Sequence, residues 1–463
     1  MTTDTPEEAT PATEPNGGRR LGQRFGVAMR IPWMPLAALA IVSMLSLSAR
    51  VWNLDGPCLR NCTTTSDHML IFDEVYYVNA ARVIDGLPAS SHYIGAPAGT
   101  DPNAEHPQLG KLIIAAGIRV FGDTPLGWRI GAILFGSLAL LGMYALVRAA
   151  RGSPWLAAAV TALAAAENLL FVHARIGTLD IFVLTFMIWS AALYMRGRRV
   201  SAGVLLGAGT CVKLVAPYMF LVFILVEALR QLSVVRGQSV QPKNERLVSR
   251  VRGLVLCGVA ATAVYAGGLE AMDRAVPAYD IAAQHTYSNS VAHTAHILKF
   301  AADLTAPGGA QGIASYPWQW LGDYKPIVYA NVDVQHVENG HPVLISTVHF
   351  LGLVNPLILV AALPALVLAL CRIWRRPEEI DILGTAWWVG MFLPFILASG
   401  VWHRISYLYY MVVILPGVIL LAARMFSRPW MPRWVTALWA VGILIAGVFL
   451  FPFVALGDPN WLA

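Results

Sequence analysis

The sequence predicts an all-α protein that crosses a membrane many times. Of its 463 residues, 57% are hydrophobic and only 13% are charged, and the mean hydropathy is +0.59. The apolar residues form long runs, such as 130–147, 254–269 and 435–453, which approach the length that spans a hydrocarbon core of about 30 Å. Because the basic residues lie mainly in short connections between these runs, the net charge of +6 indicates topology rather than nucleic-acid binding.

Eleven spans are expected from the apolar runs, and they are 33–50, 130–147, 154–171, 178–195, 201–212, 214–229, 254–270, 344–370, 383–400, 404–424 and 433–453. With the N-terminus in the cytoplasm, the cytoplasmic segments hold most of the 33 lysines and arginines. The exterior segments hold most of the 27 acidic residues. The positive-inside rule therefore supports this threading.

The membrane topology of two ambiguous segments is assigned from the side of the membrane on which their flanking residues are expected. Residues 201–229 are expected to cross twice, with a turn near Lys213, because the arginines on both flanks belong in the cytoplasm. Residues 109–122 are expected to form an amphipathic helix in the outer interface, because their apolar residues follow helical spacing while Lys111 and Arg119 lie off that stripe.

The chain is expected to hold one multispanning domain, 33–455, with large exterior loops at 51–129 and 271–343. Residues 1–32 are polar and predict a disordered cytoplasmic tail, and residues 456–463 an exterior tail. No internal repeat suggests a transporter of paired halves. Cys58 and Cys62 lie in the first exterior loop, where a disulfide and two free thiols are both open, and a single cysteine pair does not indicate a metal site.

The adjacent carboxylates of Asp73 and Glu74 are the leading candidates for chemistry. They follow the first span, close to where the chain leaves the bilayer. Carboxylates near hydrocarbon are costly, so they tend to be kept for proton transfer, cation binding or substrate capture. Adjacent residues on a helix point about 100° apart, so we expect only one of the two to face a reaction.

Basic side chains are expected on the same exterior surface, and they are His106, Lys111, Arg129, Lys213 and Arg404. Lysine and arginine are what a phosphate needs, and a carboxylate is what deprotonates a hydroxyl. A lipid-linked phosphosugar donor and a hydroxyl acceptor would use both. Structural interpretations remain open: Lys111 could reach the interface from its helix, and Arg129 and Arg404 could be anchors at span ends.

Further polar and aromatic residues lie beside these candidates. Asp180 could cap the fourth span or pair with Arg175. Tyr407 lies next to Arg404 in an aromatic segment, and Trp318 belongs to the aromatic run Tyr316–Trp320, which could simply lie on the membrane surface.

The sequence resembles the protein O-mannosyltransferase family, particularly its bacterial members, over residues 35–455. Five segments match in the family's order: the acidic pair in Phe72–Tyr76, Glu105–Lys111 against a His-Pro-Pro-Leu-Gly-Lys motif, Ala174–Asp180 against Ala-Arg-x-x-x-Leu-Asp, Ala314–Trp320 against Ser-x-Pro-Trp-x-Trp, and Arg404–Pro416. Gln108 stands where the family motif has its second proline, and the aromatic neighbour of Lys213 is absent.

The resemblance implies a fold of the GT-C glycosyltransferase class and an inverting transfer of mannose from polyprenyl-phosphate mannose to Ser or Thr hydroxyls of exported proteins. By carry-over, Asp73 would be the general base and Glu74 its neighbour. Arg129 would meet the donor phosphate, with Lys111, Lys213 and Arg404 as further candidates. The pocket would include His106, Arg175, Asp180, Trp318 and Tyr407. No metal or other cofactor is expected, since arginines can neutralise the leaving phosphate.

The resemblance also implies a bacterial plasma-membrane enzyme with its site on the exterior face, acting on proteins as they leave the translocation machinery. One alternative in the same class transfers the sugar to a lipid or cell-wall glycan. An alternative of another class is a transporter or lipid flippase, with Asp73 and Glu74 as a proton relay. The outer-face position of the acidic residues and the absence of a repeat argue against the transporter.

Overall fold

A computed structural model describes residues 32–57, 65, 68–236, 247–338 and 341–451, with only the backbone of 331–349. The predicted terminal tails lie outside the described residues apart from residue 32, and so do Cys58 and Cys62.

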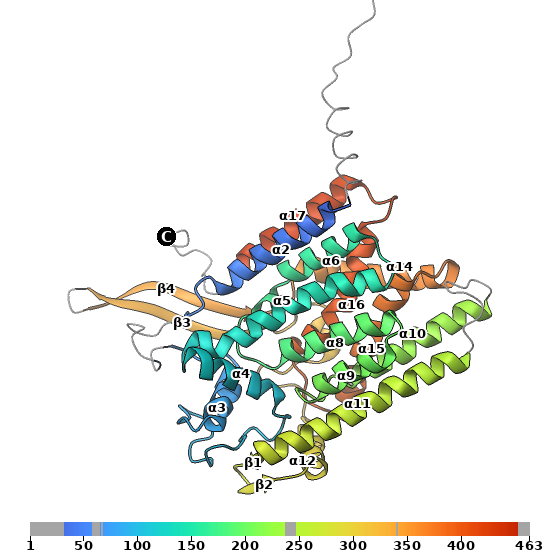
Figure 1. Ribbon diagram of the computed structural model, residues 1–463. Coiled ribbons are helices and arrows are strands. Elements are labelled where there is room, and N and C mark those ends of the chain that lie inside the picture. Colours follow the sequence, from blue (N-terminus) through green and yellow to red (C-terminus); the bar gives the residue numbers. More distant parts are fainter. Residues whose placement is uncertain (1–31, 58–64, 66–67, 237–246, 339–340, 452–463) are drawn as a thin grey trace, which may run out of the picture.

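The described residues form a bundle of long helices that run side by side (Figure 1). Seven of these helices are long and apolar enough to cross a membrane. They are α2 (Met34–Val51), α5 (Pro125–Ala149), α10 (Tyr218–Val235), α11 (Leu247–Ala275), α14 (Pro356–Arg375), α15 (Glu379–Val401) and the continuous stretch of η2 (Leu408–Tyr410) and α16 (Met411–Phe426). Three shorter apolar helices join them, α6 (Pro154–Ala166), α8 (Asp180–Met195) and α17 (Arg433–Phe449). The chain is a multi-pass membrane protein.

The centre of the bundle is α16, which packs against α6, α14 and α15. Its close approach to α15 depends on glycine: a Cβ added at Gly417 would lie 2.7 Å from the backbone nitrogen of Trp388 and 3.0 Å from the carbonyl oxygen of Gly384. Small residues at such crossings let two helix backbones approach and gain dispersion contacts, which drive helix association in lipid.

Local sequence signals begin the helices that carry the site. Pro125 occupies the first turn of α5, and the Thr124 side chain accepts a hydrogen bond from the Gly127 backbone N–H at 3.3 Å. Proline suits this position because its missing N–H has no intrahelical partner there, and the threonine satisfies one of the free donors.

Each of the eleven predicted spans overlaps helix in the structure, and the number of membrane crossings stays a prediction. The hairpin at Lys213 is confirmed, since α9 (Arg199–Thr210) ends before it and α10 begins after it. The third predicted span is divided into α6 and α7 (Asn168–His173).

Two predicted span boundaries are wrong. The span predicted at 344–370 begins only at Pro356, because residues 341–352 form strand β4 (His341–Gly352), paired antiparallel with β3 (Ile327–Glu338). Proline at the first position and an Asn355 side chain that accepts from the Leu357 N–H fix the start of α14. The span predicted at 404–424 likewise becomes helical only at residue 408.

One end of the bundle carries the connecting segments, and we call it the loop-bearing end. It holds α3 (Glu74–Ile84), α4 (Leu109–Phe121), the short hairpin of β1 (Ala278–Asp280) and β2 (His285–Tyr287), and α12 (Ser290–Asp303) (Figure 1). The predicted amphipathic helix is α4, and its place in a membrane interface stays a prediction. The short α13 (Pro317–Trp320) follows α12 in the chain.

Candidate active site at the loop-bearing end

The two adjacent carboxylates have different surroundings. Glu74 is the first residue of α3 and is fully buried. Its Oε1 accepts hydrogen bonds from the Arg129 Nε–H at 2.9 Å and the Gly177 N–H at 2.7 Å. Its Oε2 accepts from Arg129 at 2.9 Å and from the Ile71 N–H at 2.7 Å. This carboxylate therefore holds together three segments of the chain, at residues 71–74, 129 and 177.

Arg129 is also fully committed. It is 1% exposed, and its five N–H groups are all used: two donate to Glu74, and three donate to the carbonyl oxygens of Leu54, Gly56 and Met69 at 2.5, 2.9 and 3.1 Å. A guanidinium has five donors, so none remains for a donor phosphate. The structure gives Arg129 a structural role in place of the predicted phosphate contact.

Lys111 does not extend to the surface either. Its ammonium is buried, 2.5 Å from an Asp101 carboxylate oxygen, and it donates to the carbonyl oxygens of Asn103 at 2.5 Å and His106 at 2.7 Å. The alternative that Lys111 reaches the membrane interface is wrong, because its ammonium is buried among partners from residues 101–106. Lys111 shapes the loop that carries His106, and it too presents no free donor to a phosphate.

Lys213 lies in the turn between α9 and α10 and reaches into the site. Its Nζ is 2.8 Å from the Asp180 Oδ1 at the start of α8, and it lies over the rings of Tyr409 and Tyr410, 5.4 and 5.7 Å from their centroids. Asp180 thus pairs with Lys213, not with Arg175 as the sequence allowed. An aromatic face stabilises a cation without neutralising it.

Aromatic rings form one wall of this cluster. Phe72, next to the carboxylate pair, stacks on Tyr329 of β3 with centroids 4.1 Å apart and meets the edge of Tyr409 at 5.4 Å. The Tyr329 hydroxyl lies 2.8 Å from the Nε2 of His173, whose other ring nitrogen is 3.1 Å from the Thr178 hydroxyl. These contacts bring β3, α7 and η2 together beside Asp73.

Asp73 itself differs from Glu74. It is half-buried at the residue before α3, and among the described residues its carboxylate has no hydrogen bond or ion pair. Burial raises the pKa of Asp73 to about 7, Lys213 opposes this rise and Asp180 adds to it. A carboxylate whose pKa lies near neutral pH is suited to accept a proton from a hydroxyl group.

Two further basic residues lie near the cluster. Burial, together with the charges of Lys213, Lys111 and Arg404, holds the pKa of His106 well below its usual range, so its ring is neutral. The His106 ring is 6.1 Å from that of Tyr77 on α3. Arg404 is half-buried and donates to the carbonyl oxygens of Ala301 and Ile405, both at 3.1 Å.

Tyr407 borders this cluster, with its ring stacked 5.6 Å from that of Tyr409. Burial raises the pKa of Tyr407, and the charges of Tyr410 and Asp73 add to that rise. The role of Tyr407 in a substrate pocket stays a prediction.

The remaining predicted pocket residues lie elsewhere. Arg175 donates to the carbonyl oxygens of Trp52 and Asn53 at 2.9 and 3.0 Å and so ties the residues after α2 to the segment between α7 and α8. Trp318 is 50% exposed and stacks on Tyr316. In the same short helix α13 it is Trp320 that is fully buried, with its ring 6.1 Å from that of Tyr410.

Three aromatic residues of the cluster were missed as site residues, and they are Phe72, Tyr329 and Tyr409. Each lies inside or beside a segment that the sequence singled out, but an aromatic residue in an apolar chain carries no signal of its own. The contact that identifies them joins residues more than 250 positions apart, as Phe72 and Tyr329 do.

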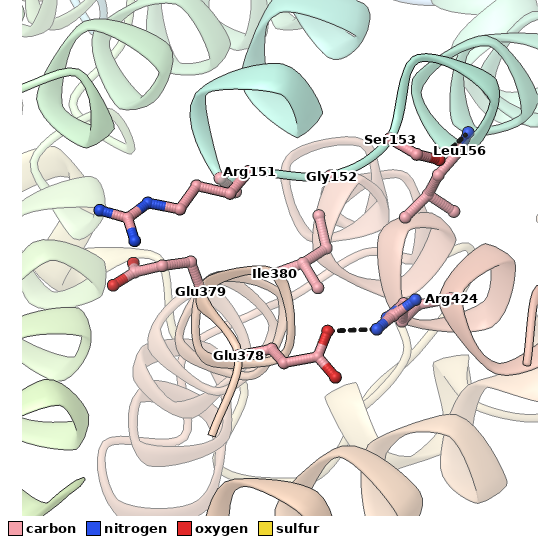
Figure 2. A pocket seen from close by; sticks show the side chains of 9 residues that line it. Arg151, Gly152, Ser153, Leu156, Glu378, Glu379, Ile380 and Arg424 are labelled. Atoms are coloured by element: carbon pink, nitrogen blue, oxygen red, sulfur yellow. Dashed lines mark hydrogen bonds and ion pairs between the residues drawn. The ribbon is translucent and has the colours of Figure 1, made fainter. Parts of the chain in front are cut away.

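A cavity of about 210 Å³ lies at the other end of α5 and is lined by residues 150–153 and 378–380, with Leu156 and Arg424. Figure 2 shows Arg151 and Glu379 pointing toward each other across it, and Arg424 paired with Glu378. At 1.5 Å per residue, the part of α5 between Arg129 and Ala149 separates the cavity from Arg129 by roughly 30 Å. This cavity is distinct from the cluster around Asp73.

Comparison with known proteins places the chain among glycosyltransferases. Residues 105–236 match the family described as dolichyl-phosphate-mannose-protein mannosyltransferase. A polyprenol-phosphate-mannose–protein mannosyltransferase of Corynebacterium glutamicum is 25% identical over 447 residues, which cover 84% of this chain and 82% of that protein. The protein of the same name from Mycolicibacterium smegmatis is 26% identical over 438 residues, 84% of this chain and 81% of its own. The predicted resemblance is confirmed.

Solved structures show the same fold. The S. cerevisiae protein O-mannosyltransferase Pmt1-Pmt2 complex bound to the sugar donor matches with a TM-score of 0.63 and 12% identity, over 93% of this chain and 91% of that chain. The Archaeoglobus fulgidus oligosaccharyltransferase in the apo form matches with a TM-score of 0.51 and 13% identity, over 92% and 56%. The predicted GT-C fold is confirmed.

Proposed function

We propose that this chain, a member of the protein O-mannosyltransferase family, transfers mannose from polyprenyl-phosphate mannose to Ser or Thr hydroxyls of exported proteins. The observation that carries the proposal is the half-buried, unpaired carboxylate of Asp73 beside the cation of Lys213. The site would lie on the exterior face of a bacterial plasma membrane, where proteins emerge from the translocation machinery. The names of the relatives support the donor and the acceptor class.

In the proposed step, the Asp73 carboxylate accepts the proton of the acceptor hydroxyl. The hydroxyl oxygen attacks the anomeric carbon from the side opposite the phosphate and forms the new glycosidic bond. The bond between the anomeric carbon and the phosphate oxygen breaks, and polyprenyl phosphate leaves with the electron pair. The configuration is inverted, and Asp73 then releases its proton to water.

Lys213 and Arg404 are the cations that we assign to the leaving phosphate. Lys213 pairs with the single carboxylate of Asp180 and lies over the rings of Tyr409 and Tyr410. Among the described residues, Arg404 has no carboxylate partner and donates to the carbonyl oxygens of Ala301 and Ile405. Positive charge placed where negative charge develops lowers the barrier of a displacement. We therefore propose that the reaction needs no metal ion.

The test is a transfer assay with purified full-length protein, polyprenyl-phosphate mannose and a threonine-rich peptide, with the glycopeptide detected by mass spectrometry. Asp73→Asn should abolish transfer while the helical content is kept. A matched control is Asp303→Asn, which removes an exposed carboxylate paired with Lys299 on α12 and should retain full activity. Full activity in Asp73→Asn would contradict the assignment of Asp73 as the general base. Absence of glycopeptide with the wild-type protein would contradict the proposed mannosyl transfer to proteins.

A further inference from the structure

A second buried polar network lies beside the site and takes no part in the proposed reaction. Its centre is His293 of α12, which is fully buried. One ring nitrogen of His293 is 2.7 Å from the Asp273 Oδ1, and the other is 3.0 Å from the Ala104 carbonyl oxygen. Both partners are acceptors, so both ring nitrogens must carry hydrogen for both contacts to be hydrogen bonds.

Gln108 joins the same carboxylate from the opposite side. Its side-chain amide donates to the Asp273 Oδ1 at 2.6 Å and to the Val276 carbonyl oxygen at 3.2 Å. Gln108 stands where the motif of the resembled family has a proline, which has no side-chain donor. This link between the loop and the end of α11 is therefore a feature of this chain.

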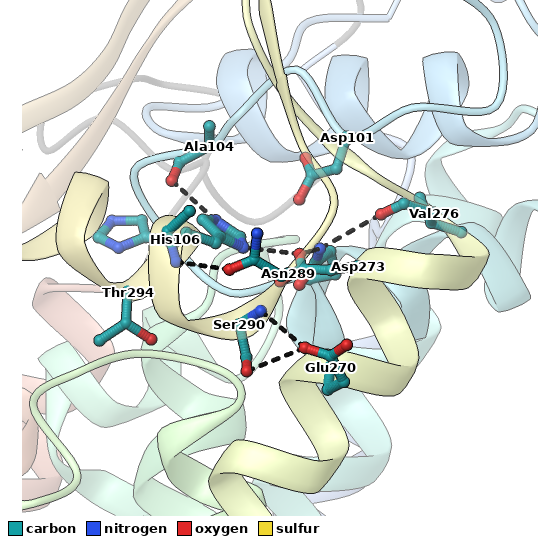
Figure 3. Close-up of polar contacts among 12 residues, drawn as sticks. Asp101, Ala104, His106, Glu270, Asp273, Val276, Asn289, Ser290 and Thr294 are labelled. Atoms are coloured by element: carbon teal, nitrogen blue, oxygen red, sulfur yellow. Dashed lines mark hydrogen bonds and ion pairs between the residues drawn. The ribbon is translucent and has the colours of Figure 1, made fainter.

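Helix α12 is in turn braced against α11. The backbone N–H and the hydroxyl of Ser290 both donate to the Glu270 Oε2, at 2.9 and 3.0 Å (Figure 3). The Tyr265 and Thr294 hydroxyls are 2.8 Å apart. His293 is thus held on a helix pair that is itself fixed, and it reaches from there to the loop at Ala104.

The other contacts of the loop leave it little freedom. Asp101 pairs with the strand after α11, its N–H donating to the Pro277 carbonyl oxygen at 2.9 Å and its carbonyl accepting from the Tyr279 N–H at 2.8 Å. Lys111 binds the loop from within. A loop held at residues 101, 104 and 108 presents His106 in one place (Figure 3), where its ring is 6.1 Å from that of Tyr77 on α3.

We propose that Asp273 and His293 are positioning residues for the transfer reaction, because they fix loop 101–108 and so hold the His106 ring at its place in the site. The proposal rests on the proposed function. Its physical basis is that a group displaced by about 1 Å can cost on the order of 10²-fold in rate. Removing the His293 ring should therefore lower the rate of transfer, because the His106 ring is then no longer held in place.

The experiment is a double-mutant cycle in the full-length protein with the assay above. His293→Ala and His106→Ala should each lower kcat/KM at least tenfold, and the double variant should be no worse than His106→Ala alone. His285→Gln, an exposed histidine of the neighbouring strand β2, is the control and should match the wild type. Independent, multiplying losses would overturn the proposal, and so would wild-type kcat/KM in His293→Ala.

Two further measurements separate positioning from a folding defect. His293→Gln, which keeps one donor, should recover part of the lost activity. Gln108→Pro cuts only the amide link, at a backbone φ of −75° that proline can adopt, and should lose less activity than His293→Ala. In His293→Ala the amides of 101–108 should exchange hydrogen faster while those of α16 are unchanged. Unchanged loop exchange overturns the proposal. An inactive wild type would instead overturn the proposed function.

Discussion

The Glu74 carboxylate and the Arg129 guanidinium meet through two hydrogen bonds of 2.9 Å inside the protein, with 0% and 1% of their side chains exposed. Removing one partner leaves the other charge buried and unpaired. We expect Glu74→Gln and Arg129→Met each to lower the free energy of unfolding by about 3–5 kcal/mol. Thermal unfolding in detergent checks this. Lys299→Met, which removes one partner of an ion pair whose two side chains are both exposed, is the control and should change little.

The pH dependence of transfer follows from Asp73. Its pKa is raised from 3.8 to about 7, with burial as the first cause, so the base form appears only as pH rises through about 7. The rate should therefore increase across that range. Lys213 lowers the pKa of Asp73, so Lys213→Met should move the acid limb to higher pH. A limb that stays in place in Lys213→Met would contradict this coupling.

The same shift predicts an effect on stability. Because the pKa of Asp73 is higher in the folded state than its ordinary value, the fold favours the protonated form. The stability that this group contributes is fully present below about pH 4 and is lost as pH rises through about 7. Asp73→Asn should thus be inactive yet more stable than the wild type at pH 8. Thermal unfolding of both proteins at pH 5 and pH 8 measures the difference.

Tyr329 offers a graded test of the aromatic wall. Tyr329→Phe removes the hydroxyl 2.8 Å from His173 but keeps the stack on Phe72, so it should cost about 0.5–1.5 kcal/mol of stability with modest loss of transfer. Tyr329→Ala also removes the stack at 4.1 Å and should lower kcat much further. Tyr316→Phe, on the exposed stack with Trp318, is the matched control. Equal activity in the two Tyr329 variants would show that the stack of Tyr329 on Phe72 is not needed for transfer.

A chelator tests the assignment of the phosphate contacts to side chains. If Lys213 and Arg404 neutralise the leaving phosphate, EDTA should leave the transfer rate unchanged, and added Mg²⁺ or Mn²⁺ should not raise it. Arg404→Gln should then lower kcat in the presence or absence of the chelator. Loss of activity on chelation, restored by one of these metals, would show that the neutralising charge comes from an ion.

The helices of the bundle could be predicted because apolar runs and arginine placement are local signals. The hairpin of β3 and β4 could not, since an apolar run next to a span gives the same hydropathy whether it is strand or helix. Pro356 was the available signal for the true start of α14, because proline is favoured in the first turn.

The site was predictable in part. The adjacency of Asp73 and Glu74 indicated that only one would face a reaction, and the structure separates them in this way. The burial of Lys111 and Arg129 and their hydrogen-bond partners could not be predicted from the sequence. These partners include backbone carbonyl groups, such as those of Leu54 and Met69 for Arg129. A carbonyl group is present at every residue, so the sequence does not mark which ones a buried cation will find.

The wide separation of the site residues along the chain has a consequence for biosynthesis. Asp73 is translated early, whereas the η2 segment that supplies Tyr409 and Tyr410 comes after α15 in the chain. At roughly 5–20 residues per second, tens of seconds pass between the two. A ribosome-bound chain can fold its first helices. Its active site is complete only once η2, which lies in the last quarter of the polypeptide, has been made.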